Sequence, residues 1–483
     1  MRKHNLSMLL DLYEMTMANG IFTSDMKDTV TYFDMFFRRV PDNGGYAIMA
    51  GLEQLMEYFE NLRFTKEDIE YLRSLNLFCE EFLVYLENFK FECDVWAVPE
   101  GTPIFPMEPI VTVKGPAIQA FLVETMVLLT INHQSLIATK ANRICSVAGD
   151  RPVMEFGARR AHGYDAAYYG ARAAIIGGCK GTSNVKTGQD FNTAVSGTMA
   201  HSWVQLFPDE YTAFKTYAEK YPDSCTLLID TFNVLKSGLP NAIKCFDEVL
   251  KPNGYRPKGV RIDSGDIAYL SKKIRKALDD AGYNDCAIVV SNSLDEHLIK
   301  ELDSQGAKIS SFGVGERLIT ASSEAVFGGV YKLAAVEFPN GEIVPKIKVS
   351  ENIAKITLPG VKIPWRLYDN ETGKAIADVI CLSDEKIDDT KPYEIFDPVH
   401  TWKRKTVTNF TAKKLQIKII EKGKKVYSSP SVNEICAFRK QCVDNLWDEV
   451  KRFENPHSYY VDLSEKLWNL RQELLSKNSK GEN

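Results

Sequence analysis

The eight residues GVRIDSGD, Gly259–Asp266, place an arginine and two aspartates at the end of a short apolar stretch. Arg261 can grip a carboxylate or a phosphate through two parallel N–H groups of its planar guanidinium. Asp263 and Asp266 can hold the hydroxyl groups of a ribose, or a Mg²⁺ ion through its water ligands. A purely structural interpretation stays open, in which Ser264 or Asp266 caps a helix and Arg261 forms an ion pair.

A single histidine, His201, stands among apolar residues in the segment VSGTMAHSWVQLF. Its imidazole could act as a general acid or base, a nucleophile, a metal ligand or a buried, hydrogen-bonded core residue. No HExxH motif and no neighbouring histidine or cysteine pair accompanies it, so metal ligation is the least favoured of the four roles. Taken alone, the segment favours the core residue.

Two further regions could bind an anion. The loop FGVGERL contains Gly313 and Gly315, whose backbone N–H groups could close on a phosphate, although a tight turn has the same composition. Lys332, in the segment GGVYKL, could add a positive charge to that site. In EFGARRAHG, Arg159 or Arg160 could face the anion while the other is solvated, or both could be surface residues.

Tyr13 lies far along the chain from these segments, in a stretch whose helical spacing ends near Gly20. The spacing alone favours a packing role in the core or at an interface. The ring could also stack on an aromatic ligand that folding or a second subunit brings near.

The composition narrows the class of protein. The chain has 483 residues, a net charge of −5 and ten cysteines with no CxxC pair. The acidic balance disfavours a nucleic-acid surface, and scattered cysteines are typical of reduced thiols in the cytosol. Charged residues interrupt the N-terminal apolar run, which excludes a signal peptide. The most apolar stretch, AFLVETMVLLTI, contains a glutamate and is too short to span a bilayer. We therefore expect a cytoplasmic protein that binds neither membrane nor nucleic acid.

The elements that must position these residues follow a regular pattern from about residue 150 to 335. Short apolar strands end in polar or glycine-rich residues, and the ends at Asp230, Asp263, Asn292 and Gly313 are separated by 33, 29 and 21 positions. This spacing is typical of βα units and predicts a parallel barrel or an open parallel sheet. Ligand chemistry then gathers at the carboxyl ends of the strands, where the candidate residues stand.

Three domains are expected. Residues 1–145 form an N-terminal α/β domain with part of the C-terminal region packed on it, 146–338 form a barrel with the active site, and 339–483 form a C-terminal domain. In the first domain, the proline-rich segment 99–115 predicts edge strands, because proline cannot donate to a sheet ladder. The final residues, SKNSKGEN, predict a disordered tail.

Taken together, the motifs resemble those of the nicotinate phosphoribosyltransferase family. The resemblance rests on their order along the chain: DLYEMTMANG, FFRRVP, EFGARRAHG, GTSNV, GTMAHS, RIDSGD, SN, GVG and GGVYKL. It implies an irregular parallel α/β barrel with an N-terminal α/β sandwich domain and a smaller C-terminal extension. It also implies a type II phosphoribosyltransferase, an ATP-dependent ligase that joins nicotinate to phosphoribosyl pyrophosphate. The products are nicotinate mononucleotide, in NAD salvage, and pyrophosphate. The family uses Mg²⁺ and ATP and forms homodimers with shared active sites.

The resemblance also implies roles for individual residues. His201 matches the histidine that ATP phosphorylates, which would make it a nucleophile. The residues implied to contact nicotinate are Tyr13, which stacks on the pyridine ring, together with Phe156, Ser183, Thr198 and Arg261. The residues implied to contact phosphoribosyl pyrophosphate are Arg159, Gly313, Gly315 and Glu316. Asp263 and Asp266 match the acidic pair near the ribose and Mg²⁺.

One position departs from the family pattern. The phosphate loop usually reads Gly-Val-Gly-Thr, whereas this chain has Glu316 in place of the threonine. We expect the Glu316 side chain to point out of the pocket and to pair with Arg317 or another cation. The alternatives are a role in binding Mg²⁺ and a protonated carboxyl.

Three other functions stay open from the sequence. Relatives that use nicotinamide carry an acidic residue where this chain has Ser183, and an acid there would repel a carboxylate. Quinolinate phosphoribosyltransferases are shorter and lack the C-terminal part. A non-catalytic nucleotide-binding relative is indicated only by Glu316. Because Ser183 is uncharged and cannot repel a carboxylate, it favours nicotinate over nicotinamide.

Overall fold

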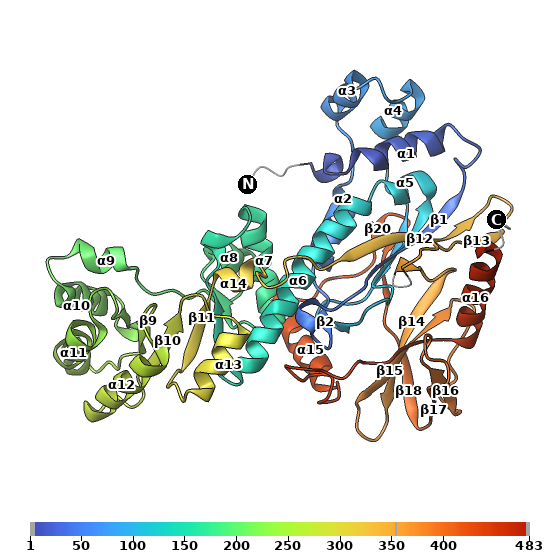
Figure 1. The fold of residues 1–483 in the computed structure, drawn as a ribbon. Coiled ribbons are helices and arrows are strands. Elements are labelled where there is room, and N and C mark those ends of the chain that lie inside the picture. The colour runs from blue at the N-terminus through green and yellow to red at the C-terminus, as the bar shows by residue number, and fades with distance from the viewer. Residues whose placement is uncertain (1–4, 353–354, 480–483) are drawn as a thin grey trace. The chain divides into compact units, whose positions relative to one another are not determined.

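A computed structural model describes residues 5–352 and 355–479 of the chain. The chain divides into two compact units, one formed by residues 1–136 and 326–483 and the other by residues 137–325. We call these unit 1 and unit 2. Both contain helices and strands, which confirms the predicted α/β class (Figure 1).

An antiparallel sheet forms the centre of unit 1. Its β1 strand, Val30–Phe37, is almost entirely buried and pairs on one side with β12 and on the other with β5. Among the described residues this sheet has seven strands, in the order β13 (Ile343–Pro345), β12 (Gly329–Glu337), β1, β5 (Val111–Pro116), β3 (Asp94–Ala97), β19 (Ile417–Glu421) and β20 (Lys424–Lys425). Segments from both ends of the chain therefore share one sheet.

The prediction of edge strands in segment 99–115 is wrong for β5, which lies between β1 and β3 inside the sheet. The prolines explain the difference. Pro103, Pro106 and Pro109 all precede β5, and Pro116 stands at its last position, so the strand keeps the N–H groups that its two ladders need.

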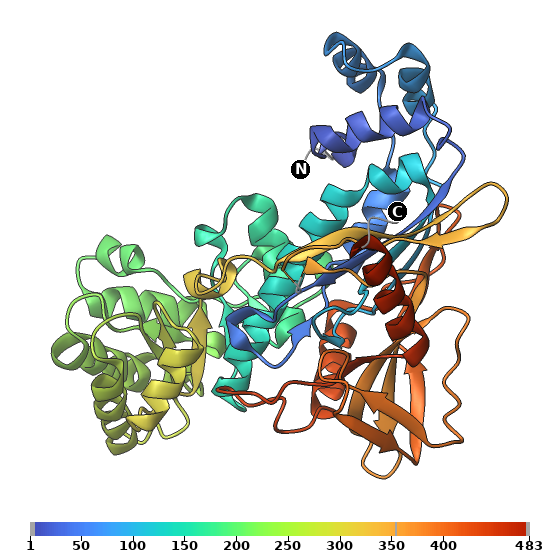
Figure 2. The same ribbon diagram turned by 45° about the vertical axis from the view of Figure 1, so that its right-hand side comes forward.

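A second sheet of unit 1 carries the C-terminal helix. In the described part of the chain it has four strands, β18 (Phe410–Lys414), β14 (Lys362–Asp369), β15 (Ala375–Leu382) and β21 (Val461–Leu463). Leu467 of α16 (Glu465–Ser479) packs against Ile380 and Leu463, and the helix lies along this sheet (Figure 2). Because α16 runs to Ser479, it includes the first residues of the expected tail, while residues 480–483 lie outside the described part.

Two further strand pairs and the remaining helices complete unit 1. The pairs are β2 (Ala47–Ile48) with β4 (Pro103–Ile104) and β16 (Tyr393–Phe396) with β17 (Arg404–Val407). The helices are α1 (Leu12–Phe22), α2 (Leu52–Asn61), α3 (Lys66–Ser74), α4 (Glu80–Glu87), α5 (Ala117–Phe121), α15 (Val432–Asp444) and the first half of α6 (Glu124–Ala148).

The helical run Ala117–Ala148 corrects the length argument made from the sequence. Its 32 residues are long and apolar enough to cross a membrane by length and composition, and it is the one such helix among the described residues. In this structure, however, 61% of its most apolar window is buried inside the protein. We therefore interpret it as a core helix.

A parallel sheet forms the centre of unit 2, whose residues are all described. It has six strands in the order β7 (Gly181–Thr182), β6 (Val153–Glu155), β11 (Ser311–Val314), β10 (Ala287–Ser291), β9 (Gly259–Ile262) and β8 (Thr226–Leu228). Every pairing is parallel, as predicted. The carboxyl ends of the six strands therefore lie at one edge of the sheet.

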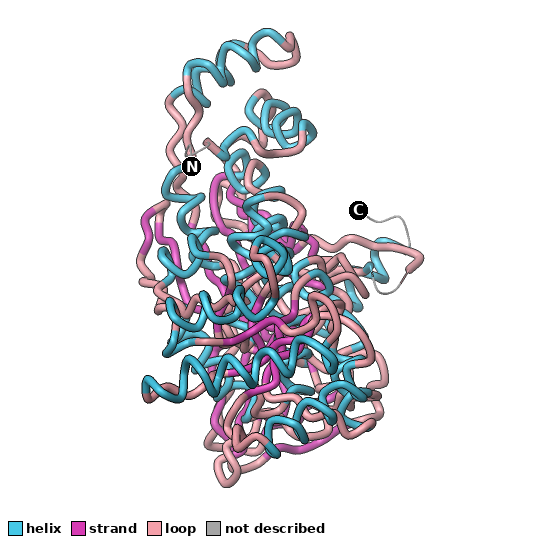
Figure 3. Tube along the Cα trace, turned by 90° about the vertical axis from the view of Figure 1, so that its left-hand side faces the viewer, coloured by secondary structure: helices cyan, strands magenta, loops and turns pink. Residues whose placement is uncertain are grey.

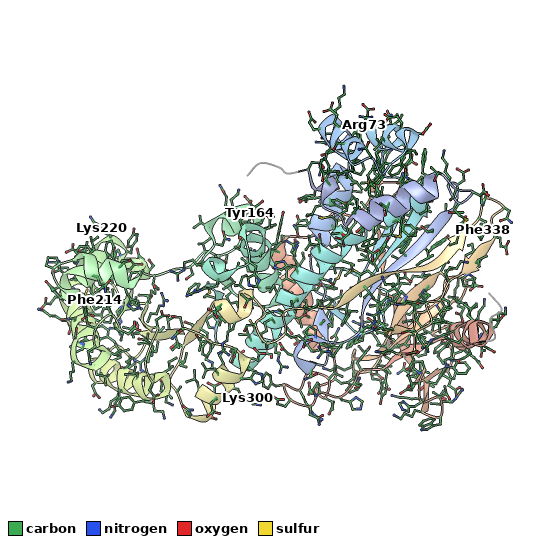
Figure 4. All side chains as sticks on the ribbon, turned by 45° about the horizontal axis from the view of Figure 1, so that its top comes forward. Arg73, Tyr164, Phe214, Lys220, Lys300 and Phe338 are labelled. Atoms are coloured by element: carbon green, nitrogen blue, oxygen red, sulfur yellow. The ribbon has the colours of Figure 1, made fainter. Side chains whose placement is uncertain are left out.

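Labelled helices flank this sheet in Figure 1, and Figure 3 distinguishes the helices (cyan) from the strands (magenta) along the whole described chain. Phe214 of α10 is fully buried, whereas Lys220 at the end of the same helix and Lys300 of α13 are exposed (Figure 4). The helices are α7 (Tyr164–Gly177), α8 (Val185–Phe191), α9 (His201–Leu206), α10 (Glu210–Lys220), α11 (Leu239–Cys245), α12 (Ile267–Asp280), α13 (Glu296–Ser304), α14 (Glu316–Ile319) and the second half of α6.

A buried carboxyl on α1 makes the stability of unit 1 depend on pH. Glu14 is fully buried, and its Oε1 accepts hydrogen bonds from the Thr125 backbone N–H at 3.1 Å and from the Thr125 hydroxyl. Its Oε2 has no hydrogen-bond partner among the described residues. Burial raises the pKa of Glu14 to about 7, and the nearby charge of Glu124 adds to the effect.

Because the folded state holds the Glu14 proton more tightly than the unfolded chain, stability falls as the pH rises from about 4.5 to about 7. We expect Glu14→Gln to match the wild type in Tm at pH 5 and to exceed it by several degrees at pH 8, reflecting about 1–3 kcal/mol. Glu60→Gln, at an exposed glutamate of α2, serves as the control and should follow the wild type. Equal Tm values for Glu14→Gln and the wild type at both pH values would contradict the assignment.

Candidate active site

Arg261 is the centre of a cluster at the carboxyl ends of three segments of unit 2. Its Nε donates to Ser291 Oγ at 2.9 Å, its Nη1 to Thr198 Oγ1 at 3.0 Å and its Nη2 to Asp263 Oδ1 at 3.2 Å. The Ser291 hydroxyl donates in turn to Asp263 Oδ1. The structure thus brings together Thr198, Arg261 and Asp263, three of the residues predicted from the sequence.

The guanidinium keeps binding capacity for a ligand. Arg261 has five N–H groups, and the three hydrogen bonds leave two of them without an acceptor among the described residues. Its side chain is 16% exposed, so a ligand can reach it where water competes only weakly. The two remaining groups suit an anion such as a carboxylate.

A second chain of contacts connects His201 with the same cluster. Asp230 follows β8, and its Oδ2 accepts hydrogen bonds from the Asp263 backbone N–H at 2.8 Å and from Ser264 Oγ at 2.7 Å. Thr231, the next residue, places its Oγ1 3.1 Å from His201 Nδ1. Asp230 Oδ1 is buried and has no hydrogen-bond partner among the described residues. His201 is half-buried at the start of α9, its Nδ1 contacts Thr231, and its Nε2 has no hydrogen-bond partner in the described part of the chain.

Phe156 forms an aromatic wall beside Arg261. Its ring centre lies 6.0 Å from Arg261 Cζ, which is a favourable cation–π distance. Gly313 is required behind the ring, because a Cβ there would lie 2.5 Å from Phe156 Cδ2. Gly313 lies within β11, whereas Gly315 directly follows it, and a Cβ at Gly315 would lie 3.1 Å from the Phe156 carbonyl oxygen. The two glycines thus permit close packing of the β6 and β11 ends.

The remaining predicted residues of unit 2 lie at the same sheet edge without joining the Arg261 network. Ser183 follows β7, is half-buried, and donates its backbone N–H to the Glu155 carbonyl at 2.9 Å. Asp266 caps α12, where its Oδ1 accepts from the Tyr269 N–H at 2.9 Å, as the structural interpretation allowed. Arg159 is exposed and forms no ion pair or hydrogen bond with the described residues.

Glu316 is exposed and pairs with a neighbouring loop. Its Oε2 lies 3.7 Å from Arg160 Nε, and the two side chains are 59% and 70% exposed. Arg317, the other cation considered from the sequence, pairs instead with Asp295. The Glu316 carboxylate therefore has a cationic neighbour on the EFGARRAHG segment.

Tyr13 belongs to unit 1, as does Lys332, whereas the Arg261 cluster belongs to unit 2. Tyr13 lies on α1 with 46% of its surface exposed, and partial burial together with the nearby Glu124 raises its pKa to about 12. Lys332 Nζ lies 3.4 Å from Glu124 Oε1. In unit 1, Lys332 thus neutralises a carboxylate.

Three family models cover almost the whole chain. They are the nicotinate phosphoribosyltransferase N-terminal domain at residues 8–132, the nicotinate phosphoribosyltransferase family at 152–351 and the C-terminal domain at 361–471. The chain belongs to the nicotinate phosphoribosyltransferase family. It is 46% identical to the nicotinate phosphoribosyltransferase of Bacillus subtilis, over 98% of this chain and 95% of that protein. It is 30% identical to the human nicotinate phosphoribosyltransferase over 95% of each chain.

Two solved structures share the fold of this chain. The crystal structure of human nicotinic acid phosphoribosyltransferase superposes with a TM-score of 0.83 and 29% identity, over 97% of this chain and all of that one. The nicotinate-nucleotide pyrophosphorylase from Pyrococcus furiosus superposes with a TM-score of 0.69 at 23% identity, over 92% of this chain and 99% of that one. The second match shows a shared fold.

Sequence reasoning assigned no role in the site to three residues of this nicotinate phosphoribosyltransferase family member. Ser291 accepts from Arg261, Asp230 holds the Asp263 backbone, and Thr231 contacts His201. Each stands at or just after the carboxyl end of a strand of the parallel sheet. Their position at the ends of predicted strands was the one signal in the sequence that could have identified them, because polar side chains at this edge lie in the same region as the recognised motifs.

Proposed function

We propose that this protein transfers phosphoribosyl from phosphoribosyl pyrophosphate to nicotinate, coupled to ATP, to give nicotinate mononucleotide and pyrophosphate in NAD salvage. The observation that carries the proposal is the Arg261 guanidinium, with two of its five N–H groups unused by the described residues, beside the Phe156 ring. A flat, aromatic carboxylate matches both surfaces at once. Family membership and the full-length relatives support the same reaction.

In this proposal the acceptor binds through its carboxylate. The two remaining N–H groups of Arg261 hold the carboxylate, and Thr198 and Asp263 fix the orientation of the guanidinium. Phe156 lies along the pyridine ring. The ring nitrogen attacks C1 of the ribose as pyrophosphate leaves. Because that nitrogen already carries a free lone pair, the site needs no general base.

The donor binds along the neighbouring strand ends. Arg159, exposed and without an ion pair among the described residues, and the backbone N–H groups that follow β11 from Gly315 onward would hold its phosphates, while Gly313 within β11 leaves room for the Phe156 ring. Charge stabilisation of the leaving pyrophosphate is the main catalytic contribution required.

Asp263 and Asp266 fit the role proposed for Mg²⁺. Within the described ranges, no three His, Cys, Asp or Glu side chains gather to hold a metal directly. Mg²⁺ commonly keeps several waters and needs only one or two carboxylates beside substrate phosphates. Asp263 and Asp266 would contact its waters, and the ion would supply neutralisation of the leaving group.

His201 is the proposed acceptor of a phosphoryl group from ATP. In the tautomer with its proton on Nδ1, the imidazole donates to Thr231, and the Nε2 lone pair is free to attack phosphorus. A phosphohistidine would add negative charge close to the Asp230–Asp263 contact. ATP cleavage could thereby change the affinity of the site for its phosphorylated ligands.

We also propose a cytoplasmic homodimer with shared active sites. Tyr13, half-exposed on α1, would supply the ring that stacks on the pyridine.

Substrate choice tests the proposal directly. We expect a kcat/KM for nicotinate at least about 100-fold above that for nicotinamide, because a site built for a charged group rejects the analogue that lacks it. Ser183→Asp should move the ratio toward nicotinamide by introducing a carboxylate that repels the acid and accepts the amide N–H. Ser304→Asp, at an exposed serine of α13, should leave the ratio unchanged. Equal values for the two acceptors in the wild type would refute the proposal.

ATP coupling depends on His201. His201→Asn should abolish ATPase activity and ATP-dependent stimulation while leaving Tm close to that of the wild type. With γ-labelled ATP, the wild type should acquire an acid-labile, base-stable label. His400→Asn, at an exposed histidine of unit 1, should label normally. Undiminished labelling of His201→Asn would exclude this residue as the acceptor.

Glu316 should affect donor binding only weakly, because its carboxylate is exposed and lies near Arg160. A carboxylate about 5 Å from the phosphate would otherwise cost roughly 3 kcal/mol per unit charge, or more than about 100-fold in affinity. We expect Glu316→Thr to lower the KM for phosphoribosyl pyrophosphate by less than about 10-fold. Glu301→Thr in α13 is the control. A fall of about 100-fold would show that Glu316 faces the phosphate, and a rise would show that it assists binding.

A further inference from the structure

We propose that Glu155 is a positioning residue that fixes the acceptor pocket by joining the two loops that form it; this inference rests on the proposed function. Glu155 ends β6, and its Oε2 accepts from Thr182 Oγ1 at 2.6 Å. Its Oε1 accepts the backbone N–H of Gly157 in the loop after β6. One carboxylate thus connects the loop after β6 with the end of β7, from which the second loop begins.

The ladder between the two strands sets up this arrangement. Glu155 and Thr182 are register partners in the parallel pairing of β6 with β7, and each is the last residue of its strand. Beyond them the backbones separate, and the Glu155 carbonyl accepts the Ser183 N–H at 2.9 Å. Thr182 Oγ1 also accepts the Asn184 N–H, at 2.9 Å. The carboxylate and the hydroxyl therefore continue the connection where the ladder ends.

The environment of Glu155 argues against a role in stability alone. The side chain is fully buried, no basic residue pairs with it in the described chain, and burial raises its pKa. Burying a carboxyl without a cation costs desolvation free energy, and an apolar side chain of similar size would fill the same space at a lower cost. What an apolar side chain cannot do is accept hydrogen bonds from two loops at once.

The residues that follow these anchors are the ones proposed to contact the acceptor. Phe156 comes directly after Glu155 and packs beside Arg261, while Ser183 comes directly after Thr182. A shift of about 1 Å in either loop would move the aromatic wall or the hydroxyl relative to the guanidinium. Glu155 therefore sets the discrimination between carboxylate and carboxamide acceptors without touching either.

Thr182→Val tests the connection, because it keeps the shape of the side chain and removes the hydroxyl. We expect faster amide hydrogen exchange in peptides covering residues 153–160 and 181–187, with other peptides unchanged. The ratio of kcat/KM for nicotinate to that for nicotinamide should fall about tenfold, the effect of one buried acceptor left unpaired. Thr182→Ser, which restores the hydroxyl, should recover both readouts.

Three further variants test the same connection. Thr216→Val removes a comparable hydroxyl hydrogen bond within α10 and should alter neither the loop exchange nor the acceptor ratio. The Glu155→Gln side chain can still accept a hydrogen bond from Gly157 and donate one to Thr182. Its ratio of kcat/KM for nicotinate to that for nicotinamide should therefore be higher than that of Thr182→Val. Glu155→Ala keeps neither contact, so its ratio should be no higher than that of Thr182→Val. If Thr182→Val matches Thr216→Val in both readouts, or if exchange accelerates across the whole of unit 2, the positioning role is overturned. A wild type that forms no nicotinate mononucleotide would refute the proposed function instead, and the exchange measurement would still test Glu155.

Discussion

The geometry of the candidate site depends on the need to satisfy one nearly buried guanidinium. Arg261 sits at the end of β9 with little access to water, so its N–H groups must find acceptors in the protein or in a ligand. Three acceptors come from three different segments, Thr198, Ser291 and Asp263, and each is thereby oriented toward the same point. The two N–H groups of Arg261 that find no acceptor among the described residues favour an anionic ligand such as a carboxylate. The parallel sheet is the framework that allows segments so far apart in sequence to converge, since all its strands end at one edge.

The contacts of Asp230 extend this arrangement toward His201. One oxygen of Asp230 holds the Asp263 backbone and the Ser264 hydroxyl, and the following residue holds the imidazole. A change of charge on His201 would therefore alter the electrostatic potential at Asp230 and Asp263, and Asp263 is hydrogen-bonded to Arg261. No long-range pathway is needed for such coupling, because the elements are neighbours in the sheet.

The sequence was most informative where local chemistry and chain spacing agree. The βα intervals predicted the parallel sheet, and the motif RIDSGD contains both Arg261 and Asp263, which the structure places in one hydrogen-bonded cluster. The role of Ser291 could not be derived, because a serine at a strand end is common and only its distance from Arg261 distinguishes it. Glu155 was hidden for a similar reason: before the register of β6 and β7 is known, nothing indicates that its carboxylate reaches Thr182. The position of β5 also depended on pairing partners from distant parts of the chain, which proline content alone could not supply.

The order of strands in unit 1 has a consequence for how the chain is made. Unit 2 is inserted between the two parts of unit 1, so β1 and its neighbour β12 are separated along the chain by the whole of unit 2 and by residues 38–136 of unit 1. At about 5–20 residues per second, the ribosome delivers β12 roughly 15–60 s after β1. During that interval β1 can pair with β5, while the backbone N–H and C=O groups along its other edge have no strand beside them. The nascent chain therefore carries an unpaired edge on a strand rich in aromatic side chains for much of its synthesis, and a chaperone would protect it best in this period.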